Sequence, residues 1–488
     1  MDFVSVAYIV FLAISCLLYY IMPKAARPVW MLACSYVFYV YSADSAKFIW
    51  LLLGASALVY ICALFIELIS KKHTAWRKVS LAASIVISLA PLVYYKYANF
   101  ALSIYADITH GKFSALKLAV PMGISYFILM GIGYLIDVYR DKQRAVRNPV
   151  YVALFLSFFP CIIAGPIERA PHMMPQFCND ITFDYNKFTG GAFRVLWGMA
   201  KKLVISQNLS VIISAVYGHM TYYDGPILLL ASIMFSYQLY IDFSALSDIA
   251  IGTGAMFGFD IMENFTRPFA AQTFSDLWRR WHISLSTWFR DYLYFPLGGS
   301  RKGKARAYIN QIIIFTVSGL WHGASFGYVI WGFINGIFLC VGKATSKLRA
   351  KIDKYNPLYY FKYPRIILKS FITFMLFTLA FIFFCAEVTA NGIEDAFYLY
   401  AHLFTGWETI FTASFADTLV AIGITEQVKW TLLGGIALIE GFEFINEPSN
   451  KIIRRVPLIL RWPLYISLIL AIAYLGNLGV SSFIYGRF

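Results

Sequence analysis

Long apolar stretches alternate with short polar loops along most of this chain. Many of the stretches approach the roughly 20 residues that a helix needs to cross a bilayer, and a helix satisfies its own backbone polar groups where lipid cannot. The pattern therefore predicts an all-α polytopic membrane protein with about 10 to 13 transmembrane helices. The candidate spans are 3–22, 30–43, 47–69, 79–97, 116–139, 148–164, 190–217, 226–258, 307–325, 328–344, 365–386, 428–446 and 458–485.

Composition agrees with this pattern. Of the 488 residues, 60% are hydrophobic and only 14% are charged, a balance more apolar than that of a soluble domain. No linker, repeat or soluble-domain-sized polar block divides the chain, so we expect one membrane domain over residues 1–488, with further helices over about 401–488. The segments 30–43 and 148–164 are short for spans, and they either tilt little, cross only part of the bilayer or line a cavity enclosed by protein.

The net charge of +15 reports topology rather than nucleic-acid binding, because the cations lie in short loops between spans. Basic residues that fall in alternate loops mark the cytoplasmic side. This rule predicts an extracytoplasmic N-terminus in a cell membrane and no nucleic-acid partner. The basic loops contain Lys24 and Arg27, then Lys71, Lys72, Arg77 and Lys78, then Arg140, Lys142, Arg144 and Arg147.

Residues 263–306 interrupt the pattern, because charged and aromatic residues are mixed through them. A re-entrant or interfacial helical segment fits this mixture better than an ordinary span. At helical spacing, Trp278, Trp281, Leu285 and Trp288 share one stripe. The stripe indicates either a buried face at a functional segment or an interfacial aromatic belt.

His322 lies in the segment Leu320-Trp-His-Gly-Ala324, between two apolar runs. An ionisable group at membrane depth is a functional candidate, and a neutral imidazole can act as a general base in acyl transfer. Gly319 and Gly323 would allow another backbone or a substrate to come close to the ring. The local sequence alone also allows a hydrogen-bonded core histidine.

The other sequence motifs do not indicate a catalytic or cofactor-binding site. Residues 323–327 match the G-x-S-x-G elbow around Ser325, but they join two apolar helical runs instead of a strand and a helix. The glycines around Gly252 lack dinucleotide-binding spacing and are typical of helix packing. No HExxH, Walker or EF-hand pattern occurs, and the seven cysteines have no ligand spacing, so we expect no metal and no bound cofactor.

A set of four polar residues lies in apolar surroundings. The set consists of Asp242 and Ser244, together with Asp137 and Asp248. These side chains either orient the histidine and line a passage or satisfy contacts between helices.

Several motifs, in the same order, resemble the membrane-bound O-acyltransferase family, in particular its bacterial branch of alginate O-acetylation subunits. The resemblance covers roughly residues 1–400. Its longest motif is Trp278-Arg-Arg-Trp-His-Ile-Ser-Leu-Ser-Thr-Trp-Phe-Arg-Asp-Tyr292, which continues to Arg301. The other motifs are Gly165-Pro-Ile-Glu-Arg169, Asp242-Phe-Ser244, Asn264-Phe-Thr-Arg-Pro268 and Leu320-Trp-His-Gly-Ala324. Cys385 departs from the family pattern, in which Arg is common before Ala.

The resemblance implies a bundle of helices and re-entrant segments around a central tunnel. It implies His322 and His282 as the catalytic residues, with His282 on a segment that faces the cytoplasm. The residues that it implies as tunnel-lining or supporting are Trp281, Ser284, Arg290, Asp291, Trp321, Asp242 and Ser244.

The resemblance also implies a function. A cytoplasmic acyl thioester such as acetyl-CoA or an acyl carrier protein would donate an acetyl group, which leaves outward through the membrane. A separate extracytoplasmic acetyltransferase would complete O-acetylation of a surface polysaccharide. D-alanyl transfer to teichoic acid, in a related branch, and a transporter or flippase that uses the intramembrane Asp and His groups are the alternatives.

Overall fold

The computed structural model describes residues 1–43, 45–355, 357–387, 389, 391–445, 453 and 455–477. Across this part of the chain the secondary structure is helical and contains no strand, which confirms the predicted all-α class. Seven helical stretches among the described residues are long and apolar enough to cross a membrane, so the chain is a multi-pass membrane protein. They are Ala46–Leu68, Thr74–Thr109, Tyr185–Tyr217, Gly225–Met256, Phe326–Ala344, Lys362–Ala386 and Leu458–Leu475.

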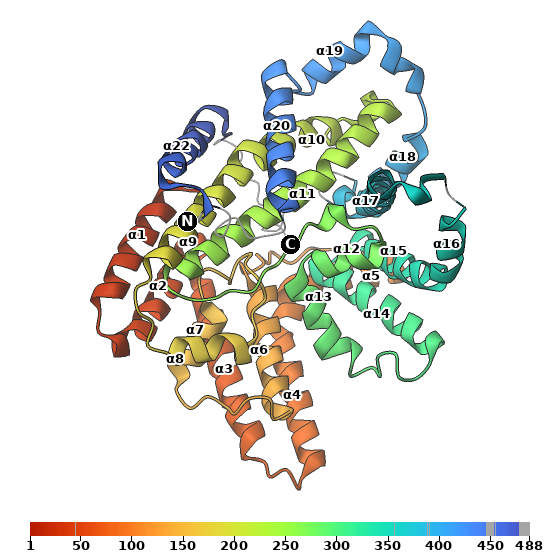
Figure 1. The fold of residues 1–488 in the computed structure, drawn as a ribbon. Helices are drawn as coiled ribbons and strands as arrows, with labels where there is room; N and C mark the ends of the chain where they lie inside the picture. Colours follow the sequence, from red (N-terminus) through yellow and green to blue (C-terminus); the bar gives the residue numbers. More distant parts are fainter. Residues whose placement is uncertain are drawn as a thin grey trace.

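The first part of the chain forms the red-to-orange helices of Figure 1. The elements are α1 Val6–Ile21, α2 Arg27–Ser42, α3 Ile49–Leu68, α4 Thr74–Leu92, a π-helical turn Val93–Tyr97, α5 Ala98–Thr109 and α6 Ile124–Tyr139. The span expected over 116–139 begins late, because Pro121 has no amide proton and Gly123 has a left-handed φ of 73°. Helices α1, α2 and α6 have 16 residues each, fewer than the roughly 20 of a perpendicular span.

The short segment expected at 148–164 forms only one helix, α7 Pro149–Ser157, and then turns. Residues 154–168 are buried without interruption. This segment is therefore enclosed by protein, and its nine-residue helix is too short to cross the bilayer. Helix α8 Ala170–Cys178 follows it.

Two long helical stretches run side by side through the middle of the molecule (Figure 1). One consists of α9 Tyr185–Ala200, the π-helical turn Lys201–Ser206 and α10 Gln207–Tyr217, and the other is α11 Gly225–Met256. A Cβ atom on Gly191 would lie 2.5 Å from the Gly252 carbonyl oxygen, and one on Gly252 would lie 2.6 Å from that of Gly191. The glycines therefore serve close helix packing, as predicted.

Residues 263–306 form no continuous span. They fold into two seven-residue helices, α12 Phe274–Arg280 and α13 Ile283–Phe289, and a π-helical turn Arg290–Tyr294. The predicted single stripe of tryptophans is wrong, because the chain turns sharply at His282, whose φ is 44°. Trp278, Trp281 and Trp288 are all buried in the protein and form no belt on its surface.

The remaining helices pack on both sides of the two central helical stretches. Helices α14 Lys304–His322 and α15 Phe326–Ala344 form a hairpin, and the later helices follow it toward the blue end of the chain in Figure 1. These are α16 Ser346–Asp353, α17 Lys362–Ala386, α18 Ile393–His402, α19 Ala413–Ala421, α20 Glu426–Phe444 and α22 Leu458–Leu475. Residue 446 and residues 478–485, parts of two expected spans, lie outside the described residues.

Candidate active site

His322 is the last residue of α14, at the turn of the α14–α15 hairpin. A Cβ atom on Gly319 would lie 2.1 Å from the Tyr328 carbonyl oxygen, and one on Gly323 would lie 2.0 Å from the Tyr328 ring. The space that these glycines leave is therefore filled by α15, which matches the first of the two predicted uses, the close approach of another backbone.

Aromatic rings surround the imidazole of His322, a residue that is 4% exposed. The ring centroids of Trp321, Trp331 and Phe384 lie 4.9, 5.2 and 5.4 Å from that of His322. These neighbours exclude bulk water from three directions, and α14, α15 and α17 hold the imidazole from separate sides.

His282 lies between α12 and α13 and is also buried. Its Nδ1 atom lies 3.1 Å from the Asn264 Oδ1 atom, and its ring packs edge-on against Phe243 with centroids 4.6 Å apart. Its Nε2 atom is buried and has no hydrogen-bond partner among the described residues. This atom is therefore available to a molecule that enters the site.

The amide of Asn264 fixes the tautomer of His282. Its oxygen accepts hydrogen bonds from the Ser284 backbone nitrogen at 3.3 Å and the Ser284 hydroxyl at 2.9 Å, and its nitrogen donates to the Ser247 hydroxyl at 3.2 Å. Because a backbone N–H can only donate, the atom that faces His282 is the oxygen. His282 Nδ1 must then carry the proton, which leaves Nε2 as an acceptor.

The two imidazoles face one cavity of about 540 Å³, and their ring centroids are 6.5 Å apart. Apolar side chains from α13 to α15 form most of its wall. Its polar lining comes from Ser275, Arg279, Ser286, Thr287, Arg290, Gln311 and Ser318. Forty residues apart in sequence, the two histidines are thus brought together by tertiary packing.

Arg290 lines the cavity and reaches the surface of the protein. The Arg290 side chain is 53% exposed and forms an ion pair with Asp291, with its Nε atom 2.8 Å from the Asp291 Oδ1 atom. The Arg140 Nη1 atom donates to the Asp291 backbone oxygen at 3.0 Å. This part of the cavity wall therefore lies beside the basic loop that follows α6, which the charge pattern predicts to be cytoplasmic.

The Gly165–Arg169 motif holds two walls of the site together. Glu168 accepts a hydrogen bond from the Met262 backbone nitrogen at 2.7 Å, two residues before Asn264. Arg169 donates to the Thr287 hydroxyl at 3.3 Å. Glu168 also binds His172 at 2.8 Å, and this hydrogen bond raises the pKa of His172.

Other expected tunnel residues lie around the cavity and do not line it. The Trp281 ring points into an apolar cluster, with its centroid 4.9 Å from that of Phe377. Ser284 is engaged by Asn264. The Trp321 ring lies beside both histidines, with its centroid 6.1 Å from that of His282 and 4.9 Å from that of His322.

Asp242 and Ser244 do not reach the histidine cavity. Asp242 pairs with Lys202 and accepts a hydrogen bond from Ser206 at 3.0 Å, while Ser244 accepts one from Lys201 at 2.9 Å. Both side chains thus join α11 to the π-helical turn after α9. Their contacts match the helix-packing alternative.

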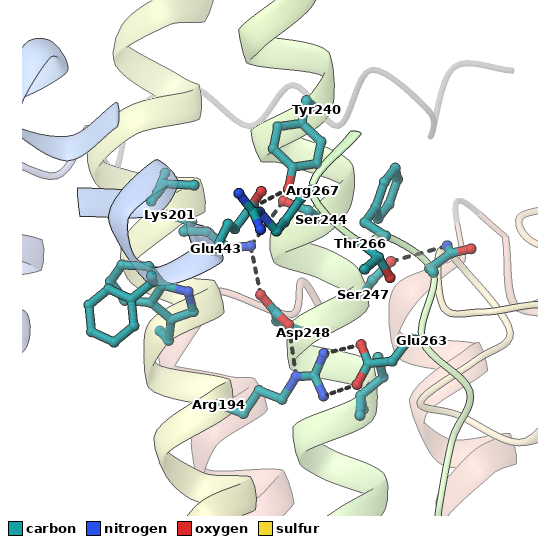
Figure 2. Close-up of a pocket in the computed structure, with 16 residues that line it drawn as sticks. Arg194, Lys201, Tyr240, Ser244, Ser247, Asp248, Glu263, Thr266, Arg267 and Glu443 are labelled. Atoms are coloured by element: carbon teal, nitrogen blue, oxygen red, sulfur yellow. Dashed lines mark hydrogen bonds and ion pairs between the residues drawn. The ribbon is translucent and has the colours of Figure 1, made fainter. Parts of the chain in front are cut away.

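A second cavity of about 220 Å³ lies between α9, α11, α20 and residues 263–267, and Figure 2 shows its ion pairs. Arg194 binds both oxygens of Glu263 at 2.6 and 2.7 Å and Asp248 at 2.8 Å, and Lys201 binds Asp248 at 2.6 Å. Its wall includes Asn264 and Ser247, which separate it from His282. Because Arg194, Lys201, Asp248 and Glu263 are paired with one another, this cavity is suited to holding Asn264 in place.

Sequence reasoning did not identify Asn264 or Lys96 as site residues. Asn264 carried no signal beyond its place in a motif. Lys96 is a buried lysine in an apolar stretch, and its Nζ atom donates to the Trp321 backbone oxygen at 2.6 Å. An ionisable residue inside a span was the available signal.

Two further predictions concern Ser325, near the turn of the hairpin, and the absence of a metal site. Ser325 precedes α15 and its hydroxyl caps the Tyr328 amide at 3.5 Å. That position is consistent with a helix cap and has no preceding strand among the described residues. Within the same described part, no group of three or more His, Cys, Asp or Glu side chains is arranged to hold a metal ion.

Comparisons with known proteins agree on one family. The sequence model of the membrane-bound O-acyltransferase family matches residues 38–386. The probable alginate O-acetylase AlgI of Pseudomonas putida is 37% identical over 384 residues, which cover 77% of this chain and 75% of that protein. The peptidoglycan O-acetyltransferase of Helicobacter pylori is 34% identical, with 79% and 76% covered. The teichoic acid D-alanyltransferase of Bacillus subtilis is 28% identical, with 45% and 58% covered.

Proposed function

Because this chain belongs to the membrane-bound O-acyltransferase family, we propose that it takes an acetyl group from a cytoplasmic thioester and passes it across the membrane for O-acetylation of a surface polysaccharide. The observation that carries the proposal is the single cavity that joins His282 and His322 to an end lined by Arg279 and Arg290. The alginate and peptidoglycan acetylases among its relatives support acetyl as the group transferred.

In this proposal His322 is the general base. Its imidazole takes the proton of an acceptor hydroxyl as that oxygen attacks the thioester carbonyl. The C–S bond then breaks, and the departing thiolate takes that proton from His322 and leaves as the thiol. His282, with Nε2 as a hydrogen-bond acceptor, faces the same cavity and orients the reacting group. Cleavage of the thioester supplies the driving force.

The donor would enter at the basic end of the cavity. Acetyl-CoA and acyl carrier proteins both present the thioester on a phosphate-bearing arm, and arginine binds phosphate with its planar fork of N–H donors. Arg279 and Arg290 lie where such a phosphate would stay while the acyl group reaches the histidines. The two arginines suit the phosphate-bearing part of the donor, and the aromatic rings near His322 suit its acyl group.

The acceptor side involves a partner. The chain consists largely of membrane helices, so we propose that a separate extracytoplasmic acetyltransferase receives the acetyl group and esterifies the polysaccharide. The N-terminus would then lie outside an inner, cytoplasmic membrane. D-alanyl transfer is disfavoured, because the D-alanyltransferase relative matches less of the chain at lower identity.

The central test replaces His322 by Ala in an otherwise unchanged strain. We expect O-acetyl groups on the surface polysaccharide to disappear, since removal of a general base costs about 10²- to 10⁴-fold in rate. Mass spectrometry of the polysaccharide measures this, and His73→Ala, which changes an exposed histidine, is the matched control.

A second assay separates enzyme from transporter. Purified protein is mixed with radiolabelled acetyl thioester and partner, and free thiol is measured. Wild-type acetylation by the His322→Ala variant, with the protein present in the membrane, would refute the role of His322. Absence of thioester turnover in the wild-type protein would favour a transporter, which leaves its cargo chemically unchanged.

A further inference from the structure

Helix α14 ends at His322, and its last carbonyl groups lack partners within the helix, as they do in any α-helix. The carbonyl of Gly319 accepts from the Gly323 amide at 3.3 Å. The next two carbonyls are satisfied by side chains from another part of the chain. Tyr97 donates its hydroxyl proton to the Leu320 oxygen at 2.8 Å, and Lys96 Nζ lies 2.6 Å from the Trp321 oxygen.

The two donors come from the π-helical turn Val93–Tyr97 that joins α4 to α5. Such turns inside α-helices are rare and occur often at functional sites. Here the turn brings two consecutive side chains to two consecutive carbonyls, more than 220 positions away in the chain. An uninterrupted helix would rotate these side chains to a different register relative to the end of α14.

Lys96 is a costly residue at this place. It is 9% exposed within the apolar stretch Thr74–Thr109, and no carboxylate among the described residues forms an ion pair with it. Its hydrogen-bond partners are the Trp321 carbonyl and the Ser125 hydroxyl, the latter at 3.4 Å. Burial of a lysine in this setting costs free energy, so its contacts indicate a function.

Lys96 also contacts the side chain of Trp321, the residue that precedes His322. Its Nζ atom lies 5.8 Å from the centroid of the Trp321 ring, within the range of a cation–π contact. The same ring lies 4.9 Å from the His322 ring and 5.7 Å from that of Tyr126. Lys96 thus holds both the backbone and the side chain of Trp321.

We propose that Lys96 and Tyr97 form a clamp on the Leu320 and Trp321 carbonyls that fixes His322 at the end of α14 in the orientation needed for acyl transfer. The clamp rests on the proposed function, because it gives His322 a geometry to preserve. Lys96 and Tyr97 do not line the histidine cavity and so are positioning residues, with no contact to the donor. A positive charge at a helix C-terminus also offsets the negative end of the helix dipole.

The test compares three variants in purified protein. Lys96→Met keeps the stem of the side chain and removes its donors, Tyr97→Phe removes one hydroxyl, and Tyr94→Phe removes the hydroxyl of a 53% exposed neighbour as the control. For acetyl thioester cleavage, Lys96→Met should lower kcat by about 10- to 100-fold and Tyr97→Phe by about 3- to 10-fold. The KM for the thioester should stay within about twofold, because the cavity lining is unchanged.

Hydrogen exchange provides a readout that does not depend on activity. Backbone amides in a peptide spanning residues 316–325 should exchange at least about fivefold faster in Lys96→Met and Tyr97→Phe than in the wild type or Tyr94→Phe. Wild-type exchange and wild-type kcat in Tyr97→Phe, or in a folded Lys96→Met, would overturn the clamp. Faster exchange in Lys96→Met and Tyr97→Phe, together with no thioester turnover by the wild-type protein, would support the clamp and count against the proposed reaction instead.

Discussion

At the scale of single residues, the site depends on which atoms His282 presents. The Asn264 side-chain oxygen accepts a hydrogen bond from Nδ1, and the Ser284 amide and the Ser247 hydroxyl hold Asn264 in that orientation. A single amide therefore determines which nitrogen of His282 carries the proton and which one can accept a hydrogen bond. The motif that contains Asn264 is eighteen positions away from His282, and its role is visible only from these contacts.

Replacement of Asn264 by Ala should lower the kcat of thioester cleavage by about tenfold or more, because His282 loses its partner and the Ser284 amide is left unsatisfied. Ser247→Ala removes only the support behind Asn264 and should have an effect of about twofold. Steady-state kinetics on purified variants measure both. Equal activity of Asn264→Ala and the wild type would show that the tautomer of His282 does not matter.

At the scale of elements, the close contact of α9 and α11 supports the ion pairs of Figure 2 and, behind them, Asn264. Arg194 and Lys201 lie on the α9 side and Asp248 lies on α11. Separation of the two helices would lengthen these contacts. Packing at the glycines thus determines the geometry of a cluster of charges several residues away.

The variant Gly252→Ala tests this packing. The added Cβ atom would lie 2.6 Å from the Gly191 carbonyl oxygen and 2.9 Å from the Val195 amide nitrogen, both rigid backbone atoms. Overpacking of this kind costs about 1–3 kcal/mol, so thermal unfolding in nanodiscs should begin several degrees lower. Gly434→Ala in α20, where no atom lies within 4 Å, is the control and should leave the unfolding temperature unchanged or raised.

At the scale of the whole molecule, the second and third basic loops lie together beside the cavity residue Arg290, because Lys71 binds Asp141 and Arg140 binds the Asp291 backbone. Arg27 and Lys24, in the first basic loop, bind the Ile181 carbonyl and the Asp180 carboxylate after α8. If these loops face the cytoplasm, the donor enters from the compartment that contains acetyl-CoA. The orientation of the chain is thus directly tied to the direction of transfer.

Cysteine labelling tests this orientation. All seven cysteines lie in the described residues, and only Cys178, at the end of α8, is exposed. A membrane-impermeant maleimide should therefore leave intact cells unlabelled and should modify Cys178 in inverted membrane vesicles. Cys178→Ser identifies the labelled site. Labelling of Cys178 from outside intact cells would place the N-terminus in the cytoplasm and reverse the proposed direction.

The sequence by itself determined the helical membrane class, the approximate positions of most spans and the family, because hydrophobic periodicity and contiguous motifs are local properties of a chain. It also singled out His322 and His282. Only the tertiary structure decided that these two share a cavity, that Asp242 and Ser244 bind lysines instead, and that Asn264 and Lys96 support the histidines. Those contacts join residues 18 to 225 positions apart, and such pairings follow from how helices pack, which no local pattern encodes.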